Sequence, residues 1–363
     1  AENVGIKYFE DAKKFLSDEL NLEVISNLKA VTNLTEARQT WEIFSEKKVD
    51  AVILFNGTFS LSNLMIEIIR NSNIPFLIWG LEEYLSDRGI LSGSMIGLMP
   101  AGAVFKNLDK KFIFVYGSLK REGVKNQIKS FFQVIKSIVF IRDSRIGLIG
   151  SRPDGFEISN YDELIIKKVF GTTLTKISMS FFLDLIDSIS DKDIDEDLKI
   201  QGNLFDTSKI NTSEARELSR VYLATKKIVK DNLLAAYAPQ CWPEPRMERK
   251  TPICSANGRL TAEGFMASCE GDIDCALTML LLHSLTDGGT PWTTDFVNYF
   301  EEKNSLLFWH CGNASFNLSD RKPLIEVVYE GPAQTAVMKP GVATVCRINQ
   351  FRGGFDLYGG IGD

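Results

Sequence analysis

The fold is decided by residues 50–80, DAVILFNGTFSLSNLMIEIIRNSNIPFLIWG. Residues 50–57 and 74–80 are short apolar runs that each end on a glycine, a pattern typical of buried strands. Between them, residues 61–72 have the apolar spacing of an amphipathic helix. A strand, a helix and a second strand in this order predict a parallel sheet flanked by helices.

The same alternation continues toward the middle of the chain. Residues 111–118 and 146–149 predict further strands, and residues 124–144 predict the helix between them. Because a new α/β segment starts near residue 120, we place a domain boundary there. The sequence thus predicts a first α/β domain over residues 1–122 and a second over residues 123–287, both of the Rossmann or flavodoxin type.

Three later segments complete the predicted fold. The charged residues 191–199 lack the glycine turn of a calcium loop, so we interpret them as a solvated face or loop. Residues 213–232 predict a long amphipathic helix with Ser213 as its N-cap. After Asp287, short β segments such as 323–331 are broken by Gly, Pro and Asn. They predict a mainly antiparallel β-barrel domain over residues 288–363.

Composition and charge exclude several classes of protein. The 41 basic and 47 acidic residues give a net charge of −6, which provides no basic surface for nucleic acid. No apolar run has the length of a membrane span, and the first residues do not resemble a signal peptide. The six cysteines lie in the last third of the chain without CxxC pairing. A reducing, cytoplasmic setting is therefore expected.

An acidic residue between two apolar runs is the first candidate for chemistry. Residues 265–269 predict a strand and residues 273–285 a helix, so Glu270 stands at the carboxyl end of a strand. In open α/β sheets ligands bind at that edge. Burying a carboxylate there is costly unless a positive charge meets it.

Two further candidates follow Glu270 along the chain. Asp295 lies in TPWTTDF, and His310 lies where the apolar run SLLFW ends. Two carboxylates and one imidazole suit a divalent cation such as Mn²⁺, with open positions for water or substrate. Taken singly, each residue has an ordinary explanation: an acid at a helix N-terminus, an acid in a turn, and a hydrogen-bonded histidine. The metal-site hypothesis therefore depends on the three residues together.

Residues 269–296, CEGDIDCALTMLLLHSLTDGGTPWTTDF, and 306–313, LLFWHCGN, resemble the L-fucose/L-arabinose isomerase family of metal-dependent aldose–ketose isomerases. CWPE at residues 241–244 and KPGVATVCRI at residues 339–348 add to the resemblance, which is closest to the L-fucose isomerase branch. The resemblance implies that Glu270 and Asp295 bind the metal and transfer protons, and that His310 is a metal ligand. It also implies two Rossmann-like domains, a C-terminal β-barrel and a homo-oligomer, a tetramer or a hexamer.

The sequence departs from this family in two places. Family members take a further histidine ligand from the barrel, whereas no histidine follows His310 here. They also begin with a strand that carries an arginine toward the substrate. We expect that segments are missing from the given chain. The alternative is a divergent member with a weakened metal site.

The chemistry that the resemblance implies is proton transfer on an open-chain sugar of the L-fucose, D-arabinose or L-arabinose type. A divalent cation stabilises the enediolate, and two carboxylates serve as base and acid. Gln240 and Trp242, near another expected strand end, are candidates for contacting sugar hydroxyls and the apolar sugar face. Two other functions stay open: an impaired homologue that binds sugar or metal without turnover, and a sugar-binding protein of the periplasmic type.

Four residues near these candidates have structural interpretations. Asp272 is expected to cap the helix that follows it, and His283 to pack within that helix. Cys269 and Cys311 are expected to behave as small buried apolar side chains.

Overall fold

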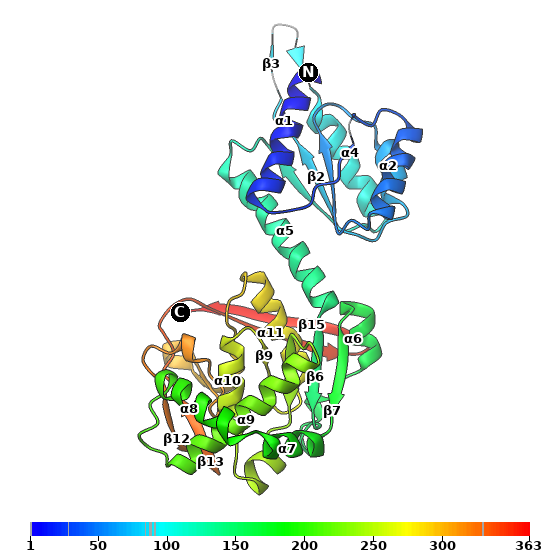
Figure 1. The fold of residues 1–363 in the computed structure, drawn as a ribbon. Coiled ribbons are helices and arrows are strands. Elements are labelled where there is room, and N and C mark those ends of the chain that lie inside the picture. The colour runs from blue at the N-terminus through cyan, green and yellow to red at the C-terminus, as the bar shows by residue number, and fades with distance from the viewer. Residues whose placement is uncertain (1, 28, 84, 87–88, 91, 329) are drawn as a thin grey trace. The chain divides into compact units, whose positions relative to one another are not determined.

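The computed structural model describes residues 2–27, 29–83, 85–86, 89–90, 92–328 and 330–363 (Figure 1). The chain divides into two compact units, Ala1–Lys136 and Ser137–Asp363. Each unit has its own parallel sheet. Tyr329, which belongs to the predicted β segment 323–331, lies outside the described residues.

The first unit contains the parallel sheet that residues 50–80 predict. Its strands lie in the order β1 (Val52–Asn56), β2 (Phe76–Gly80) and β5 (Phe112–Tyr116). Val52 pairs with Phe76 in parallel register. The strand–helix–strand prediction is confirmed here, including the helix α3 (Ser62–Ile69) between β1 and β2.

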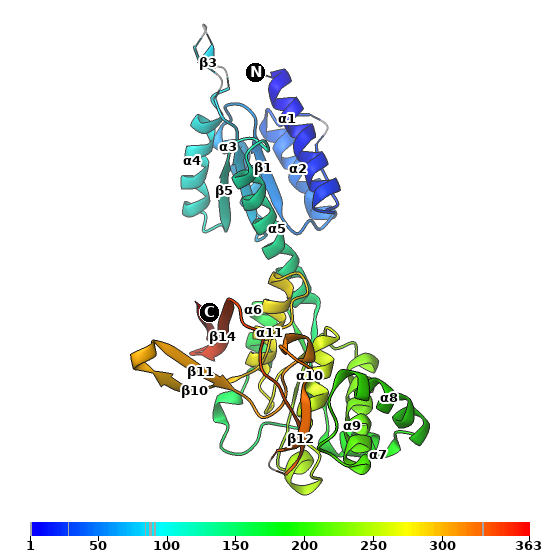
Figure 2. The ribbon, with the colours of Figure 1, turned by 90° about the vertical axis from the view of Figure 1, so that its left-hand side faces the viewer.

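Helices cover both faces of this sheet (Figures 1 and 2). Leu54, Ile69 and Leu98 belong to a core between β1, β2 and three helices on one face. On the other face the Phe9 ring lies 6.1 Å from that of Phe55. The remaining elements of the unit are α1 (Glu2–Lys14), η1 (Phe15–Glu19), α2 (Leu34–Glu46), α4 (Ser94–Asn107), β3 (Leu85–Ser86) and β4 (Gly89–Ile90).

The long helix α5 (Glu122–Asp143) joins the two units. It buries Ile128 within the first unit and Ile141 within the second. The sequence predicted a helix over residues 124–144, in agreement with the structure. The division between the units falls inside this helix, after Lys136.

The sheet of the second unit has strands added on both sides of its first strand. Its four parallel strands lie in the order β7 (Thr173–Ile177), β6 (Arg145–Ile149), β8 (Ala236–Pro239) and β9 (Met266–Ala267). From β6 the chain first adds β7 on one side and then β8 on the other. The carboxyl ends of β6 and β8 thus form a switch point, the usual ligand site of such sheets.

Two hydrophobic cores enclose this sheet. Phe182, Ile228 and Leu260 pack on one face from three helices, and Ile166 and Leu277 pack on the other from two. The helices involved are α7 (Met179–Ser188), α9 (Thr212–Asp231), α10 (Cys254–Ala262), α6 (Glu163–Phe170) and α11 (Ile273–Leu285). Among the helices that the structure describes, none has the length and apolar character needed to cross a membrane.

One local interpretation of this region is confirmed in part and another is wrong. The charged residues 191–199 belong to a helix, α8 (Asp191–Leu204), and not to a loop; most of them are exposed, as predicted for a solvated face, whereas Asp197 on the inner face is buried. The helix α9 begins one residue earlier than expected, with Asn211 and not Ser213 as its N-cap. Asn211 and Glu214 form a reciprocal capping box, which satisfies two backbone N–H groups.

The C-terminal strands are antiparallel, as predicted, but they form no barrel within the part of the chain that the structure describes. They form three separate two-stranded sheets. These pairs are β10 (Asp295–Phe300) with β11 (Ser305–Trp309), β12 (Leu324–Val328) with β13 (Gly331–Thr335), and β14 (Ala343–Phe351) with β15 (Gly354–Gly362). Short helical turns are η2 (Glu157–Ser159), η3 (Glu244–Glu248), η4 (Glu301–Lys303) and η5 (Phe316–Leu318).

Two of the three pairs pack on helices of the second unit. The Ile348 N–H of β14 donates to the Thr278 hydroxyl of α11 at 2.9 Å. The β12–β13 pair packs near α10, where the Gln334 amide donates to the Ala314 carbonyl at 2.6 Å. The β10–β11 pair projects outward (Figure 2), and all six β10 residues are exposed.

The buried ion pair of α8 gives a test of the fold. Arg259 of α10 donates to both carboxylate oxygens of Asp197, at 2.9 and 2.7 Å, and both side chains are only 3% exposed. We predict that Asp197→Ala lowers the free energy of unfolding by about 3–5 kcal/mol, because Arg259 would keep a buried, unpaired charge. Urea denaturation measures this change.

A matched control lies two residues earlier on the same helix. Asp195 also pairs with an arginine, Arg216, but its side chain is 60% exposed. Asp195→Ala should therefore cost less than about 1 kcal/mol. Equal losses for the two variants would contradict the interpretation.

Candidate active site

The candidate site lies at the switch point of the second sheet. The loop after β6 and the loop after β8 meet there, because Gln240 accepts hydrogen bonds from the Ser151 N–H at 2.8 Å and from the Ser151 hydroxyl at 3.1 Å. The turn after β9 joins them, since the Gly271 N–H donates to the Pro239 carbonyl at 3.1 Å. Three loops from three adjacent strands thus converge on one sheet edge.

Glu270 stands in a constrained turn at this edge. Its φ of 57° places a non-glycine residue in the left-handed region, where side chains are disfavoured. Gly271 follows with φ 67°, and a Cβ atom there would lie 2.7 Å from the Ser151 carbonyl oxygen and 2.9 Å from the Arg152 Cα. Only glycine fits this close approach. The turn therefore holds the Glu270 carboxyl in a fixed place beside the loop after β6.

The surroundings of Glu270 favour its protonated form. Burial is the largest cause of the raised pKa of this carboxyl, and the negative charge of Asp295 raises it further. The charge of His310 and a hydrogen bond from Trp242 lower the pKa but do not offset the burial. The carboxyl thus titrates closer to neutral pH than an ordinary glutamate does.

The β10–β11 hairpin brings Asp295 and His310 to one place. Asp295 begins β10 and pairs with Trp309 at the end of β11. The Thr294 hydroxyl also donates to the Trp309 carbonyl at 3.1 Å. His310 follows directly, so residues far apart in sequence lie at the same end of the hairpin. Both affect the pKa of Glu270, but ligand atoms of Glu270, Asp295 and His310 do not all lie within 4.8 Å of one another in the described part of the chain.

His310 is half-buried, with its ring held by the next residue. Burial alone lowers the pKa of His310, but Cys311 and the carboxylates of Asp295 and Glu270 raise it overall. Its Nδ1 accepts a hydrogen bond from the Cys311 N–H at 2.9 Å. A neutral ring with this bond carries its proton on Nε2. For Nε2 to bind a cation, the proton must move to Nδ1, which breaks the bond to Cys311.

The donor set fits a hard divalent cation in part. The Glu270 and Asp295 carboxylates offer oxygen atoms of the kind that such a cation prefers, and the negative charge of Asp295 raises the pKa of Glu270. The His310 imidazole could join them only after the change of tautomer.

Gln240 and Trp242 both lie at the site but differ in burial and in their contacts. Gln240 is 6% exposed, and its amide nitrogen donates to the Trp242 carbonyl at 3.3 Å and to Glu244 at 2.6 Å. With the bonds from Ser151, protein groups contact both the oxygen and the nitrogen of this amide. Trp242 is half-buried, and its ring meets that of Phe156 edge-on, with the centroids 5.6 Å apart.

The structural interpretations of Asp272 and His283 agree with the structure. The Asp272 side chain accepts from the Cys275 N–H at 2.8 Å and caps α11. His283 is half-buried, with Nδ1 2.7 Å from the Gly289 carbonyl oxygen.

The cysteines near the site carry more chemistry than the sequence predicted. Arg246 donates to Cys254 at 3.1 Å and to Cys311 at 3.2 Å, and the two sulfurs lie 3.8 Å apart. A hydrogen bond from Cys254, together with His310 and Arg246, lowers the pKa of the Cys311 thiol to about 3. Cys311 is therefore not an ordinary small apolar side chain. The clustering of all six cysteines in the last third of the chain was the available signal.

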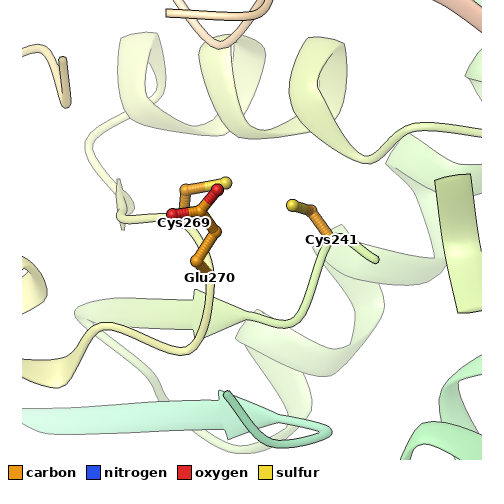
Figure 3. A group of neighbouring side chains, drawn as sticks. All are labelled: Cys241, Cys269 and Glu270. Atoms are coloured by element: carbon orange, nitrogen blue, oxygen red, sulfur yellow. The ribbon is translucent and has the colours of Figure 1, made fainter. Parts of the chain in front are cut away.

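A second group of side chains lies beneath the Glu270 turn. Single donor atoms of Cys241, Cys269 and Glu270 all lie within 4.8 Å of one another (Figure 3). Both cysteines are buried, at 1% and 3% exposure. Sequence reasoning missed this group, because Cys241 and Cys269 come from different strands and their meeting depends on the strand order.

The chain is 25% identical over 340 residues to the sulfoquinovose isomerase of Priestia megaterium (strain ATCC 12872 / QMB1551), covering 92% of this chain and 76% of that protein. It is 27% identical over 276 residues to the sulfoquinovose isomerase of Alkalicoccus urumqiensis, covering 74% of this chain and 61% of that protein. The sulfoquinovose isomerase of Clostridium sp. (strain MSTE9) is 25% identical over 314 residues, covering 86% and 69%.

No known family profile matches the sequence. The similarity to these relatives nevertheless extends over most of the chain, and they carry the name of isomerases. The prediction of an enzyme that isomerises a sugar is thereby confirmed. The placement in the L-fucose isomerase branch stays a prediction.

A buried carboxyl in the first turn of α11 predicts a pH dependence of stability. Asp274 is 3% exposed, and burial raises its pKa to about 6, although the Gln350 N–H donates to it at 2.7 Å. An unfolded aspartate titrates near pH 4. The folded state thus binds more protons between about pH 4 and 6, and stability falls as the pH rises through this window.

We predict that Asp274→Asn removes this loss and raises the free energy of unfolding at pH 7 by about 2 kcal/mol. The asparagine keeps an oxygen for the Gln350 N–H. Denaturation of both proteins between pH 4 and 7 measures the effect. Asp272→Asn should have the opposite sign, because it breaks the 2.6 Å bond from Arg347. An Asp274→Asn variant that gains nothing at pH 7 relative to pH 4 would show that this carboxyl titrates normally.

Proposed function

We propose that this chain is an aldose–ketose isomerase that moves a carbonyl group between C1 and C2 of an open-chain sugar. The observation that carries the proposal is the position of Glu270, a half-buried carboxyl with a raised pKa at the switch point. Similarity over 92% of the chain to a protein named as an isomerase supports the same conclusion.

Glu270 is the proposed proton carrier. The reaction removes a weakly acidic proton from C2 and delivers one to C1. A catalytic group works best when its pKa lies near the working pH, and burial moves Glu270 in that direction. Asp295, at the neighbouring hairpin end, is the proposed second group, which serves the sugar hydroxyl proton. The fixed turn keeps the Glu270 carboxyl in place for both transfers.

We propose Mn²⁺ as the cofactor, held by Glu270, Asp295 and His310. When bound, a divalent cation supplies Lewis-acid stabilisation of charge on the sugar oxygens. Before the reaction the cation would hold the two carboxylates ionised and oriented toward it. His310 would release the Cys311 N–H and present Nε2.

The proposed substrate is sulfoquinovose, a hexose with a sulfonate at C6, because the relatives above are named for it. The resemblance to the L-fucose branch makes L-fucose, D-arabinose and L-arabinose the comparison sugars. Trp242 is the proposed surface for the apolar face of the sugar. Gln240 would contact a sugar hydroxyl only after releasing Ser151 or Glu244, so we assign it the positioning of the two loops.

We further propose a cytoplasmic homo-oligomer, a tetramer or hexamer. The exposed apolar side chains of the β10–β11 pair support an assembly, since patches of this kind usually meet a partner. They include Phe296, Tyr299, Leu306 and Trp309. A monomer in light scattering would contradict this part of the proposal.

The substrate is tested by isomerisation of matched sugars. Sulfoquinovose should give ketose with the highest kcat/KM, above D-glucose, which differs only at C6, and above L-fucose and the two arabinoses. Ketose formation is followed by chromatography. A kcat/KM for L-fucose above that for sulfoquinovose would move the assignment to the L-fucose branch.

The proton carriers are tested by isosteric variants. We predict that Glu270→Gln and Asp295→Asn each lower kcat by about two to four orders of magnitude, the usual contribution of a positioned proton-transfer group. Glu301→Gln is the control, because Glu301 is exposed at the other end of the same hairpin. Full activity of Glu270→Gln would remove Glu270 from the mechanism.

The cofactor is tested by removal and return of the metal. Dialysis against a chelator should abolish ketose formation, and Mn²⁺ should restore it. In Asp295→Asn, restoration should need a higher Mn²⁺ concentration, because one oxygen ligand is weakened. Full activity of protein shown to be metal-free by elemental analysis would refute the metal requirement.

A further inference from the structure

The two cysteine pairs near the site differ in the charge that faces them. The guanidinium of Arg246 donates to both sulfurs of the Cys254–Cys311 pair. The Cys241–Cys269 pair instead lies beside the carboxyl of Glu270, with donor atoms of the three residues within 4.8 Å of one another. Hydrogen bonds from a guanidinium disfavour a cation at the first pair, and a neighbouring carboxylate favours one at the second.

The geometry beneath Glu270 is close to that of a metal site. In Figure 3 the sulfur of Cys241 points toward that of Cys269, and the carboxylate of Glu270 lies beside the Cys269 sulfur. Donor atoms of the three residues lie within 4.8 Å of one another. Around a tetrahedral Zn²⁺ with bonds of about 2.0–2.3 Å, ligand atoms lie about 3.5 Å apart. A side-chain movement of about 1 Å would close the site.

The donor types favour a different cation from the one proposed for the sugar reaction. Thiolates select soft and borderline ions, whereas Mn²⁺ prefers oxygen ligands. Cys241 lies two residues after β8 and Cys269 two residues after β9, so both donors stand in the loops at the carboxyl ends of adjacent strands.

We propose that Cys241, Cys269 and Glu270 form a binding site for a thiophilic divalent cation, Zn²⁺ or Cd²⁺. On binding, each thiol releases its proton to solvent and the ion gains two sulfur bonds and one carboxylate bond, with water at the fourth position. The site shares Glu270 with the proposed sugar reaction. If that proposal holds, an ion bound here withdraws the Glu270 carboxyl from the sugar and inhibits the enzyme.

Titration with Cd²⁺ tests the site without any sugar. When one equivalent of Cd²⁺ is added, the metal-free protein should develop the ultraviolet charge-transfer band of cadmium–thiolate bonds. Cys241→Ser and Cys269→Ser should each weaken Cd²⁺ binding by at least about 100-fold, the upper end of the cost of losing a supporting residue. Glu270→Gln should weaken binding but keep the band, because both sulfurs remain.

Matched controls come from the other cysteines. Cys254→Ser and Cys346→Ser should leave both the band and the affinity unchanged. A band that persists in Cys241→Ser and Cys269→Ser, or one that disappears in Cys254→Ser, would overturn the proposal.

X-ray absorption of the unaltered protein loaded with Zn²⁺ is a second test, and it does not depend on whether the cysteine variants fold. It should show two sulfur neighbours at about 2.3 Å and lighter atoms at about 2.0–2.2 Å. A shell of oxygen and nitrogen alone would overturn the proposal. Because neither measurement depends on turnover, failure of this site and failure of the isomerase proposal are distinguished.

Discussion

The close approach of the Glu270–Gly271 turn to the loop after β6 is the constraint on which the site depends. Any side chain at residue 271 would meet the Ser151 carbonyl oxygen at 2.7 Å. With glycine there, the Gly271 N–H bonds to Pro239, and Glu270 accepts a left-handed backbone. The turn thus ties together loops from β6, β8 and β9 and places a carboxyl where they meet. Strain of this kind persists where the surrounding structure enforces it, commonly at functional sites.

The order of the strands explains why this edge of the sheet carries the site. The chain adds β7 and then β8 on opposite sides of β6, the arrangement in which open α/β sheets usually bind ligands at the carboxyl ends of the strands. The hydrogen bonds between Gln240 and Ser151 join the loops after β6 and β8 at this edge. The β10–β11 pair then delivers Asp295 and His310 from outside the sheet. Charge of both signs therefore surrounds Glu270.

Periodicity and end signals were sufficient to predict most elements of the α/β units. The helix predicted over residues 273–285 has these bounds in the structure, because Asp272 caps it and its apolar residues are continuous. The helix α8 was not predicted, since its acidic residues resemble a solvated segment. Only the partner Arg259, distant in sequence, explains why Asp197 is buried. Contacts between residues distant in sequence also decide the arrangement of the C-terminal strands. Their antiparallel pairing follows from local turns, but the assembly of the pairs depends on contacts between them.

Local sequence could identify a candidate residue where its own neighbours in the chain were sufficient evidence. Glu270 was identifiable from the apolar runs on both sides of it, and His310 from its position at the end of an apolar run. Asp295 was identified only as an acid that lies between them in the sequence. The contact of Cys241 with Cys269, and that of Arg246 with Cys311, depend on tertiary neighbours. The hydrogen bonds between Ser151 and the Gln240 amide could not be predicted either, because Ser151 is distant from Gln240 in the sequence.

Proton transfer through a carboxyl group is the central claim, and isomerisation of sulfoquinovose in deuterated water tests it most directly. A carboxyl that takes the C2 proton exchanges it with solvent, so mass spectrometry and NMR should find solvent deuterium bound to C1 of the ketose. Ketose formed at full rate with no deuterium on carbon would show that hydrogen moves directly between the two carbons, and would contradict the account.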